Sequence, residues 1–240
     1  MISTIKELRY KLSLKNTLSL AEESTIASLF DEIAKFLIEE CVILWNGRKY
    51  GFRNIEFYFF NRNHQDIITH PRRSKALQWF VNDFGGIDLN FESCYDESEE
   101  YYKNNSKRKP LLNDNCCFCG ILIRELLWIN GPDGNPIVLR GPLACAEMFR
   151  LCDAVDGKSD FPVLTAEKSN LRLKQKSAED LLRGRYNIYC KSGNVEAEIN
   201  RKVGNIMNNY GKESLLSHAD MQQAFDKYKD KPYWYCAESL

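Results

Sequence analysis

The feature that most constrains the fold is a β-hairpin signal at Asn46-Gly47, between the two β-prone arms of CVILWNGRKYGF (41–52). Asn-Gly accepts the positive φ angles of a tight turn, which favours two antiparallel strands joined directly. A helix is expected just before this hairpin, over residues 24–41, with Ser24 as its N-cap and apolar residues recurring on one face. Those apolar residues are Ile26, Leu29, Phe30, Ile33, Phe36 and Leu37.

Further strands and helices are expected along the rest of the chain. One strand is expected to begin near Arg53, and others are expected at 87–91, 118–129, 186–190 and within KPYWYC (231–236). The expected helices are GPLACAEMFRLCDAV (141–155), 196–213 and 218–229. An acidic block followed by a basic one over 95–115 predicts a mobile surface loop. Without an internal repeat or a clear linker, the pattern indicates a single α+β domain over residues 1–240.

Charge and length place limits on the partners. The 240 residues include 33 Lys and Arg and 33 Asp and Glu, so the formal charges cancel. A neutral chain argues against strong, sequence-independent nucleic-acid binding, although the basic run KNNSKRK (103–109) leaves a local basic face open. No secretory signal and no apolar run of roughly 18 residues is evident, so we expect no membrane partner and a cytoplasmic or other intracellular, reducing location.

Two clusters contain residue types that bind metals. The thiols of CCFC (116–119) lack a second pair of ligands at zinc spacing, so we expect Cys116, Cys117 and Cys119 to be small buried residues at the start of a strand. His64 and His70 flank Asp66, but their spacing forces no third ligand. We therefore predict neither a metal nor a cofactor.

Three charged residues lie inside otherwise apolar, β-prone stretches: Glu56, Asp88 and Arg124. An ionised group on a buried strand is costly unless it is paired, so Glu56 and Arg124 on neighbouring strands would stabilise each other. Side chains alternate along a strand, and the alternative is that each of the three faces solvent. Glu56, however, shares its face with Tyr58 and Phe60, which favours the wall of a pocket.

The alternation of side chains around Glu56 and Arg124 gives both residues apolar neighbours. In the stretch from Ile55 to Phe59, Ile55, Phe57 and Phe59 share the face opposite Glu56. Leu122 and Leu126 share the face of Arg124. Both charged residues thus have apolar neighbours on their own face.

Several short motifs resemble, in order, those of the alkyladenine (3-methyladenine) DNA glycosylase family. EFY (56–58) is similar to the family's E-A-Y, and GILIRELLWING (120–131) resembles its V-L-(L/I)-R-A-L-E-P strand, with Arg124 on the arginine. GPLACAEMFRLCDAVDG (141–157) is similar to the helix G-P-x-K-L-C-Q-A-L-G-I. GRYNIY (184–189) and KPYWYC resemble the closing segments.

The resemblance implies one domain built around a curved, mainly antiparallel sheet with surrounding helices and a nucleobase pocket. It implies metal-free, monofunctional hydrolysis of the N-glycosidic bond of a modified or damaged base, with DNA as the partner. Glu56 would activate water, and Arg124 would hold that water and the carboxylate. Tyr58 and His70 would line the pocket. His70 lies further downstream than its family counterpart, so the resemblance requires an insertion before it.

The chain also departs from the family pattern. The Y-V-Y-x-x-Y-G-M segment that supplies the inserted tyrosine is absent, and Trp79, Phe80 and Phe84 are the candidate substitutes. Asn90 is a candidate match for the pocket asparagine. Asp88 has no counterpart, and it is either a second acid of the site or a residue that caps a strand end.

Three functional hypotheses follow from the sequence. The first is excision of a base that has been flipped out of DNA. The second is hydrolysis of nucleosides or single-stranded nucleic acid; duplex binding weakens steeply with salt, whereas small-nucleoside hydrolysis barely responds. The third is a non-catalytic binding module on the same fold, in which Glu56 would be salt-bridged away from any cavity.

Overall fold

The spine of the fold is strand β2 (Arg48–Asn61), which lies inside an eight-stranded sheet. The computed structural model describes residues 1–69, 72–81, 86–95, 115–150, 161–182, 223–224 and 226–238, with the side chains of 147–150 left aside. Strand β1 (Cys41–Trp45) runs into β2 through Asn46 and Gly47, whose φ angles are 50° and 74°. Positive φ at both central residues is the geometry of a type I′ turn, and the predicted hairpin is confirmed.

The sheet is antiparallel at every strand pair that the described residues form. Its main order is β3 (Trp79–Val81), β4 (Ile87–Asn90), β5 (Cys117–Trp128), β2, β1 and β7 (Val163–Ala166), with β6 (Ile137–Arg140) added to β5 and β8 (Trp234–Cys236) added to β2. The strands expected at 87–91, at 118–129 and within KPYWYC are confirmed. The strand that begins near Arg53 in our prediction starts five residues earlier, because the turn at 46–47 leads into it directly. The strand expected at 186–190 lies outside the described residues.

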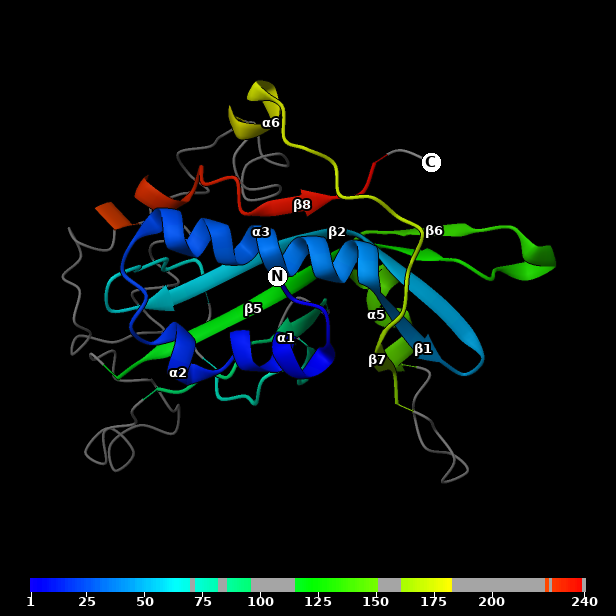
Figure 1. The fold of residues 1–240 in the computed structure, drawn as a ribbon, viewed down its shortest axis with the longest axis horizontal. Coiled ribbons are helices and arrows are strands. Elements are labelled where there is room, and N and C mark those ends of the chain that lie inside the picture. The colour runs from blue at the N-terminus through cyan, green and yellow to red at the C-terminus, as the bar shows by residue number, and fades with distance from the viewer. Residues whose placement is uncertain are drawn as a thin grey trace.

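The sheet curls so that its two edges approach each other. Trp79, on edge strand β3, donates its indole N–H to the carbonyl oxygen of Pro162 at 2.8 Å, and Pro162 directly precedes the opposite edge strand β7. The result is a half-barrel with few helices around it, drawn as a ribbon in Figure 1. The predicted α+β class with a curved antiparallel sheet is confirmed.

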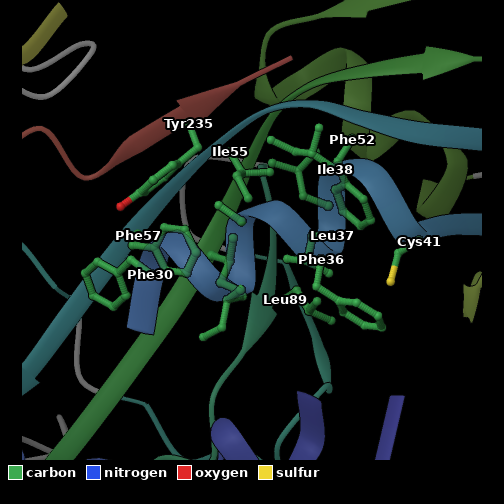
Figure 2. Packing of buried hydrophobic residues seen from close by; sticks show 14 of the residues in the cluster. Phe30, Phe36, Leu37, Ile38, Cys41, Phe52, Ile55, Phe57, Leu89 and Tyr235 are labelled. Carbon is green, nitrogen blue, oxygen red and sulfur yellow. The ribbon is translucent and has the colours of Figure 1, made fainter. Parts of the chain in front are cut away.

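Helix α3 (Glu23–Glu40) packs against the sheet with the predicted apolar face. The ring of Phe30 stacks on Phe57 of β2 with centroids 4.4 Å apart, and residues of α3, β2, β4 and β8 meet in one core cluster in Figure 2. The prediction that Ser24 is the N-cap is wrong. The helix begins one residue earlier, after Glu22, whose carbonyl accepts the N–H groups of Thr25 and Ile26, so Ser24 lies within the first turn.

The remaining described helices are short. They are α1 (Ile5–Lys11), α2 (Leu14–Thr17), α5 (Pro142–Arg150), α6 (Ala178–Leu182) and the 3₁₀ turn η1 (Pro132–Gly134). The predicted helix starting at Pro142 is therefore confirmed over 142–150. The loop at 96–114 and the helix expected at 196–213 lie outside the described residues, as does most of 218–229. In the part of the chain that is described, no helix has the length and apolarity to cross a membrane.

The start of β5 accounts for the CCFC thiols. Cys116, Cys117 and Cys119 are fully buried, which confirms that they act as small buried residues at the beginning of a strand. Cys117 and Cys119 belong to the core cluster beneath α3, with their Sγ atoms 3.8 Å apart. Within the described ranges, no group of three His, Cys, Asp or Glu residues is placed to hold a metal ion.

The two faces of β2 differ as predicted. Ile55, Phe57 and Phe59 join the core beneath α3. Phe60 is buried outside that core and stacks on Phe118 of β5 with centroids 4.5 Å apart. Glu56 and Tyr58 alternate with the core residues, so they belong to the face turned away from α3.

We predict that Phe57→Ala lowers the free energy of unfolding by about 3–5 kcal/mol, because it removes a fully buried ring from the centre of the core. Urea unfolding of the intact chain measures the change. Val163→Ala is the control, since Val163 is 56% exposed on an edge strand and should change stability by less than about 0.5 kcal/mol. Equal losses in the two variants would contradict the packing described for α3.

Candidate active site

The register of three strands places polar residues in two adjacent rows. Glu56 of β2 lies opposite Leu122 of β5, which lies opposite Asp88 of β4. In the next row, Tyr58 lies opposite Gly120, which lies opposite Asn90. Residues that oppose each other in antiparallel strands point to the same face. The sheet therefore brings four of the predicted site residues together on one face.

Glu56 and Arg124 form a buried ion pair. The Arg124 Nε donates to Glu56 Oε2 at 2.5 Å, and its Nη2 also contacts Oε2. Glu56 is 1% exposed and Arg124 is 6% exposed, so both charges are removed from water. The expectation that either residue simply faces solvent is wrong, and the predicted pairing of Glu56 with Arg124 is confirmed.

A β-bulge directs Arg124 toward this pair. Ile123 lies opposite Ile55 and Glu125 lies opposite Asn54, so Arg124 is the extra residue on β5. A bulge re-aims a side chain and increases the local twist of its strand. A second shift, at Arg53 of β2, restores the register beyond the bulge. The arginine is thus positioned by an irregularity of the backbone as well as by attraction to the carboxylate.

Arg124 is held as a cation. Burial lowers the pKa of its guanidinium, but attraction to the Glu56 carboxylate and hydrogen bonding to it and to Tyr58 outweigh burial, so the pKa lies above its usual value. Its Nη2 lies 3.4 Å from the Tyr58 hydroxyl oxygen. The arginine therefore connects the carboxylate to the aromatic residue of the neighbouring row.

The two oxygens of the Glu56 carboxylate have different surroundings. Both contacts from Arg124 go to Oε2. No described residue donates a hydrogen bond to Oε1. One oxygen is therefore fixed by the arginine, and the other is available to accept a hydrogen bond from a water molecule or a substrate.

Arg72 is a site residue that the sequence did not reveal. Its Nη1 donates to Asp88 Oδ2 at 2.5 Å and to Asn90 Oδ1 at 2.9 Å, and its guanidinium carbon lies 4.8 Å from the centre of the Phe80 ring. Arg72 belongs to the polar stretch PRRSK (71–75), which looks like a surface loop, yet it is buried. The available signal was Asp88 itself, because a carboxylate on a buried strand requires a cation.

Gly120 leaves room for Arg72. A Cβ atom at this position would lie 2.6 Å from Arg72 Nη1 and 3.3 Å from Asp88 Oδ2. The guanidinium thus occupies the space that a side chain of β5 would otherwise fill, between Tyr58 and Asn90. One of the two predictions for Asp88 was that it caps a strand end. This prediction is wrong, because Asp88 lies within β4 and binds Arg72.

The other predicted residues have different placements. His70 and Phe84 lie outside the described residues. His64 is fully buried, and its two ring nitrogens lie 2.9 Å from the Phe59 carbonyl oxygen and 2.9 Å from the Tyr233 hydroxyl, which is a structural role. The indole N–H of Trp79 donates the hydrogen bond that joins the two edges of the sheet, and the ring of Phe80 lies against Arg72.

We predict that Gly120→Ala lowers the free energy of unfolding by about 1–3 kcal/mol, because the new methyl group displaces a buried, paired guanidinium. The loss should shrink by about 1 kcal/mol or more when Gly120→Ala is made in an Arg72→Ala background, where the space is empty. Chemical unfolding of the four proteins completes the cycle. An equal loss in both backgrounds would show that Arg72 does not lie over Gly120.

No family model matches the sequence, and no solved structure matches the fold. The chain is similar to an uncharacterized protein of Acanthamoeba polyphaga mimivirus, with 29% identity over 109 residues. The match covers 40% of this chain and 47% of the viral protein, so the chain spans less than half the length of that relative.

Proposed function

We propose that this protein hydrolyses the N-glycosidic bond of a modified or damaged base in DNA, with Glu56 activating the attacking water. One observation carries the proposal. Glu56 is a buried carboxylate with one oxygen held by Arg124 and the other free of any hydrogen bond from the described residues. A carboxylate kept for stability alone would be better satisfied at both oxygens.

The chemistry needs a base beside the anomeric carbon of the sugar. A water molecule bound to Oε1 would transfer a proton to Glu56 as its oxygen attacks that carbon. The C–N bond would break with its electron pair moving to the departing base. The transition state resembles an oxocarbenium ion, which a nearby carboxylate stabilises. The proposed reaction is metal-free and uses no cofactor.

Arg124 and Tyr58 would prepare the site for this step. Arg124 fixes the orientation of the carboxylate through Oε2, which leaves Oε1 for the water. Tyr58 is only partly buried, and its ring would stack on a base that has been flipped out of a duplex. Asp88 and Asn90 would face the substrate from β4, and His70 remains a predicted pocket residue.

The resemblance to alkyladenine DNA glycosylases supports the same proposal. The motif EFY supplies Glu56 and Tyr58, the segment GILIRELLWING supplies Arg124, and Asn90 is the candidate pocket asparagine. These three segments are far apart in the sequence, and strands β2, β5 and β4 bring the residues to one face of the sheet. Residues that matched by chance would be expected to scatter over both faces. This agreement is independent of the state of the Glu56 oxygens.

Hydrolysis of nucleosides or single-stranded nucleic acid is the second candidate. It is favoured by the equal numbers of acidic and basic residues, 33 of each, because a duplex-binding protein usually presents a basic face. Glu56 and Arg124 would carry out the same hydrolytic step on a nucleoside or on single-stranded nucleic acid. A catalytic rate that is insensitive to salt would favour a free nucleoside over a duplex substrate.

We predict that Glu56→Gln abolishes base release while leaving the protein folded, because the amide cannot accept the proton of the attacking water. The measurement is mass spectrometry of free bases after incubation with genomic DNA and RNA, including modified phage DNA. Glu39→Gln is the matched control, since Glu39 is a half-buried glutamate on α3 away from the pair. It should release bases at the rate of the unmodified protein.

A free base that appears with the unmodified protein and with Glu39→Gln, but not with Glu56→Gln, would name the substrate. Undiminished release by Glu56→Gln would overturn the role of this residue. No release from any pool would favour the non-catalytic binding module.

A further inference from the structure

Asn90 is a fully buried side chain with one half of its amide unused. Its Oδ1 accepts a hydrogen bond from Arg72, but its Nδ2 has no hydrogen-bond partner in the part of the chain that is described. A buried donor without an acceptor is costly, and most buried polar groups are satisfied. The exception calls for an acceptor that is not part of the described protein.

The orientation of this amide is determined by its neighbour. An arginine can only donate hydrogen bonds, so the Asn90 atom beside Arg72 Nη1 must be the oxygen. The N–H₂ group is therefore the one left over. Arg72 is itself held by Asp88 and by the ring of Phe80, so the amide is supported from behind.

The free donor lies across the sheet from Glu56. Asn90 is on β4 and Glu56 is on β2, with β5 between them. Two strand spacings amount to about 10 Å. A water molecule, a sugar carbon and a nucleobase in line span a distance of this order. The residue between Tyr58 and Asn90 is Gly120, and the Arg72 guanidinium that holds the Asn90 amide lies over it.

We propose that Asn90, supported by Arg72, binds the leaving base, and that the substrates of this site are bases that depart as anions. The inference rests on the proposed glycosidic hydrolysis. When the C–N bond breaks, its electron pair moves to the base and spreads onto a carbonyl oxygen or ring nitrogen. The Asn90 N–H₂ group donates to that atom, and the nearby guanidinium favours its charge. The departed base then takes a proton from solvent.

This assignment selects a chemical class of substrate. Keto bases that are neutral in the nucleotide, such as uracil, leave as anions and gain from a donor. Bases that carry a positive charge, such as 7-methylguanine, leave as neutral molecules and gain little. The site should therefore act on neutral keto bases in preference to cationic alkylated ones.

Binding of free bases tests the anion site without any turnover. The probes are 5-nitrouracil, whose ring is anionic at neutral pH, and thymine, which has a similar shape and is neutral. Calorimetry with the full chain should show the anion bound about tenfold or more tightly than thymine, as expected for a hydrogen bond to a charged group. Asn90→Asp keeps the acceptor for Arg72 but removes the donor, so it should abolish this preference.

Two further variants distinguish the loss of the Asn90 donor from a general loss of stability. Asn90→Leu removes both polar atoms with little change in volume, and it should also lose the preference. Thr17→Val removes a buried hydroxyl elsewhere, near Cys117, and should retain it. Single-turnover release from oligonucleotides with 2′-deoxyuridine, 5-fluoro-2′-deoxyuridine or 7-methylguanine then tests the same idea in the reaction.

The outcomes separate this inference from the proposed function. Faster release of the uracil-type bases, with a selective loss of that release in Asn90→Asp, supports both. Base release that shows no such preference, or that Asn90→Asp leaves unchanged, overturns the inference alone. Asn90-dependent binding of 5-nitrouracil without release from any substrate overturns the proposed hydrolysis and leaves the anion site. The absence of both overturns both.

Discussion

The interaction on which the candidate site depends is the burial of two ion pairs on one face of a curled sheet. Charges removed from water require partners, and the register of β2, β5 and β4 supplies them. Glu56 is matched by Arg124 through a bulge, and Asp88 is matched by Arg72 over a glycine. The two pairs are therefore neutral in sum. Among the described residues, no hydrogen bond reaches Glu56 Oε1 or leaves Asn90 Nδ2.

The two faces of the sheet divide stability from chemistry. The face beneath α3 is an aromatic and aliphatic core, in which Phe30 and Phe57 stack. The opposite face holds the paired charges, which contribute little to stability when compared with apolar residues of similar size. Glu56 follows Ile55 and precedes Phe57 on β2, so the strand that anchors the core also positions the carboxylate.

The features of the fold and of the site that could be predicted from the sequence are those that follow from local rules. The hairpin, the apolar face of α3 and the pairing of Glu56 with Arg124 follow from turn chemistry, periodicity and the cost of a buried charge. Arg72 was missed because its loop looks polar and exposed, and its burial depends on β4. The bulge at Arg124 and the closure of the sheet by Trp79 and Pro162 depend on contacts between distant segments, which no local pattern encodes. The N-cap of α3 was misplaced by two residues, at Ser24 instead of Glu22, because serine is a preferred capping residue.

The central claim is that Glu56 and Arg124 are kept on this face for a reaction and not for stability. The most direct measurement is the urea-unfolding free energy of the Glu56→Leu/Arg124→Met double variant beside that of the unmodified protein. The account predicts that the double variant is at least as stable, because a buried ion pair replaced by apolar side chains of similar volume is neutral or stabilising. A loss of about 3 kcal/mol or more would show that the pair holds the sheet together, and would contradict the claim.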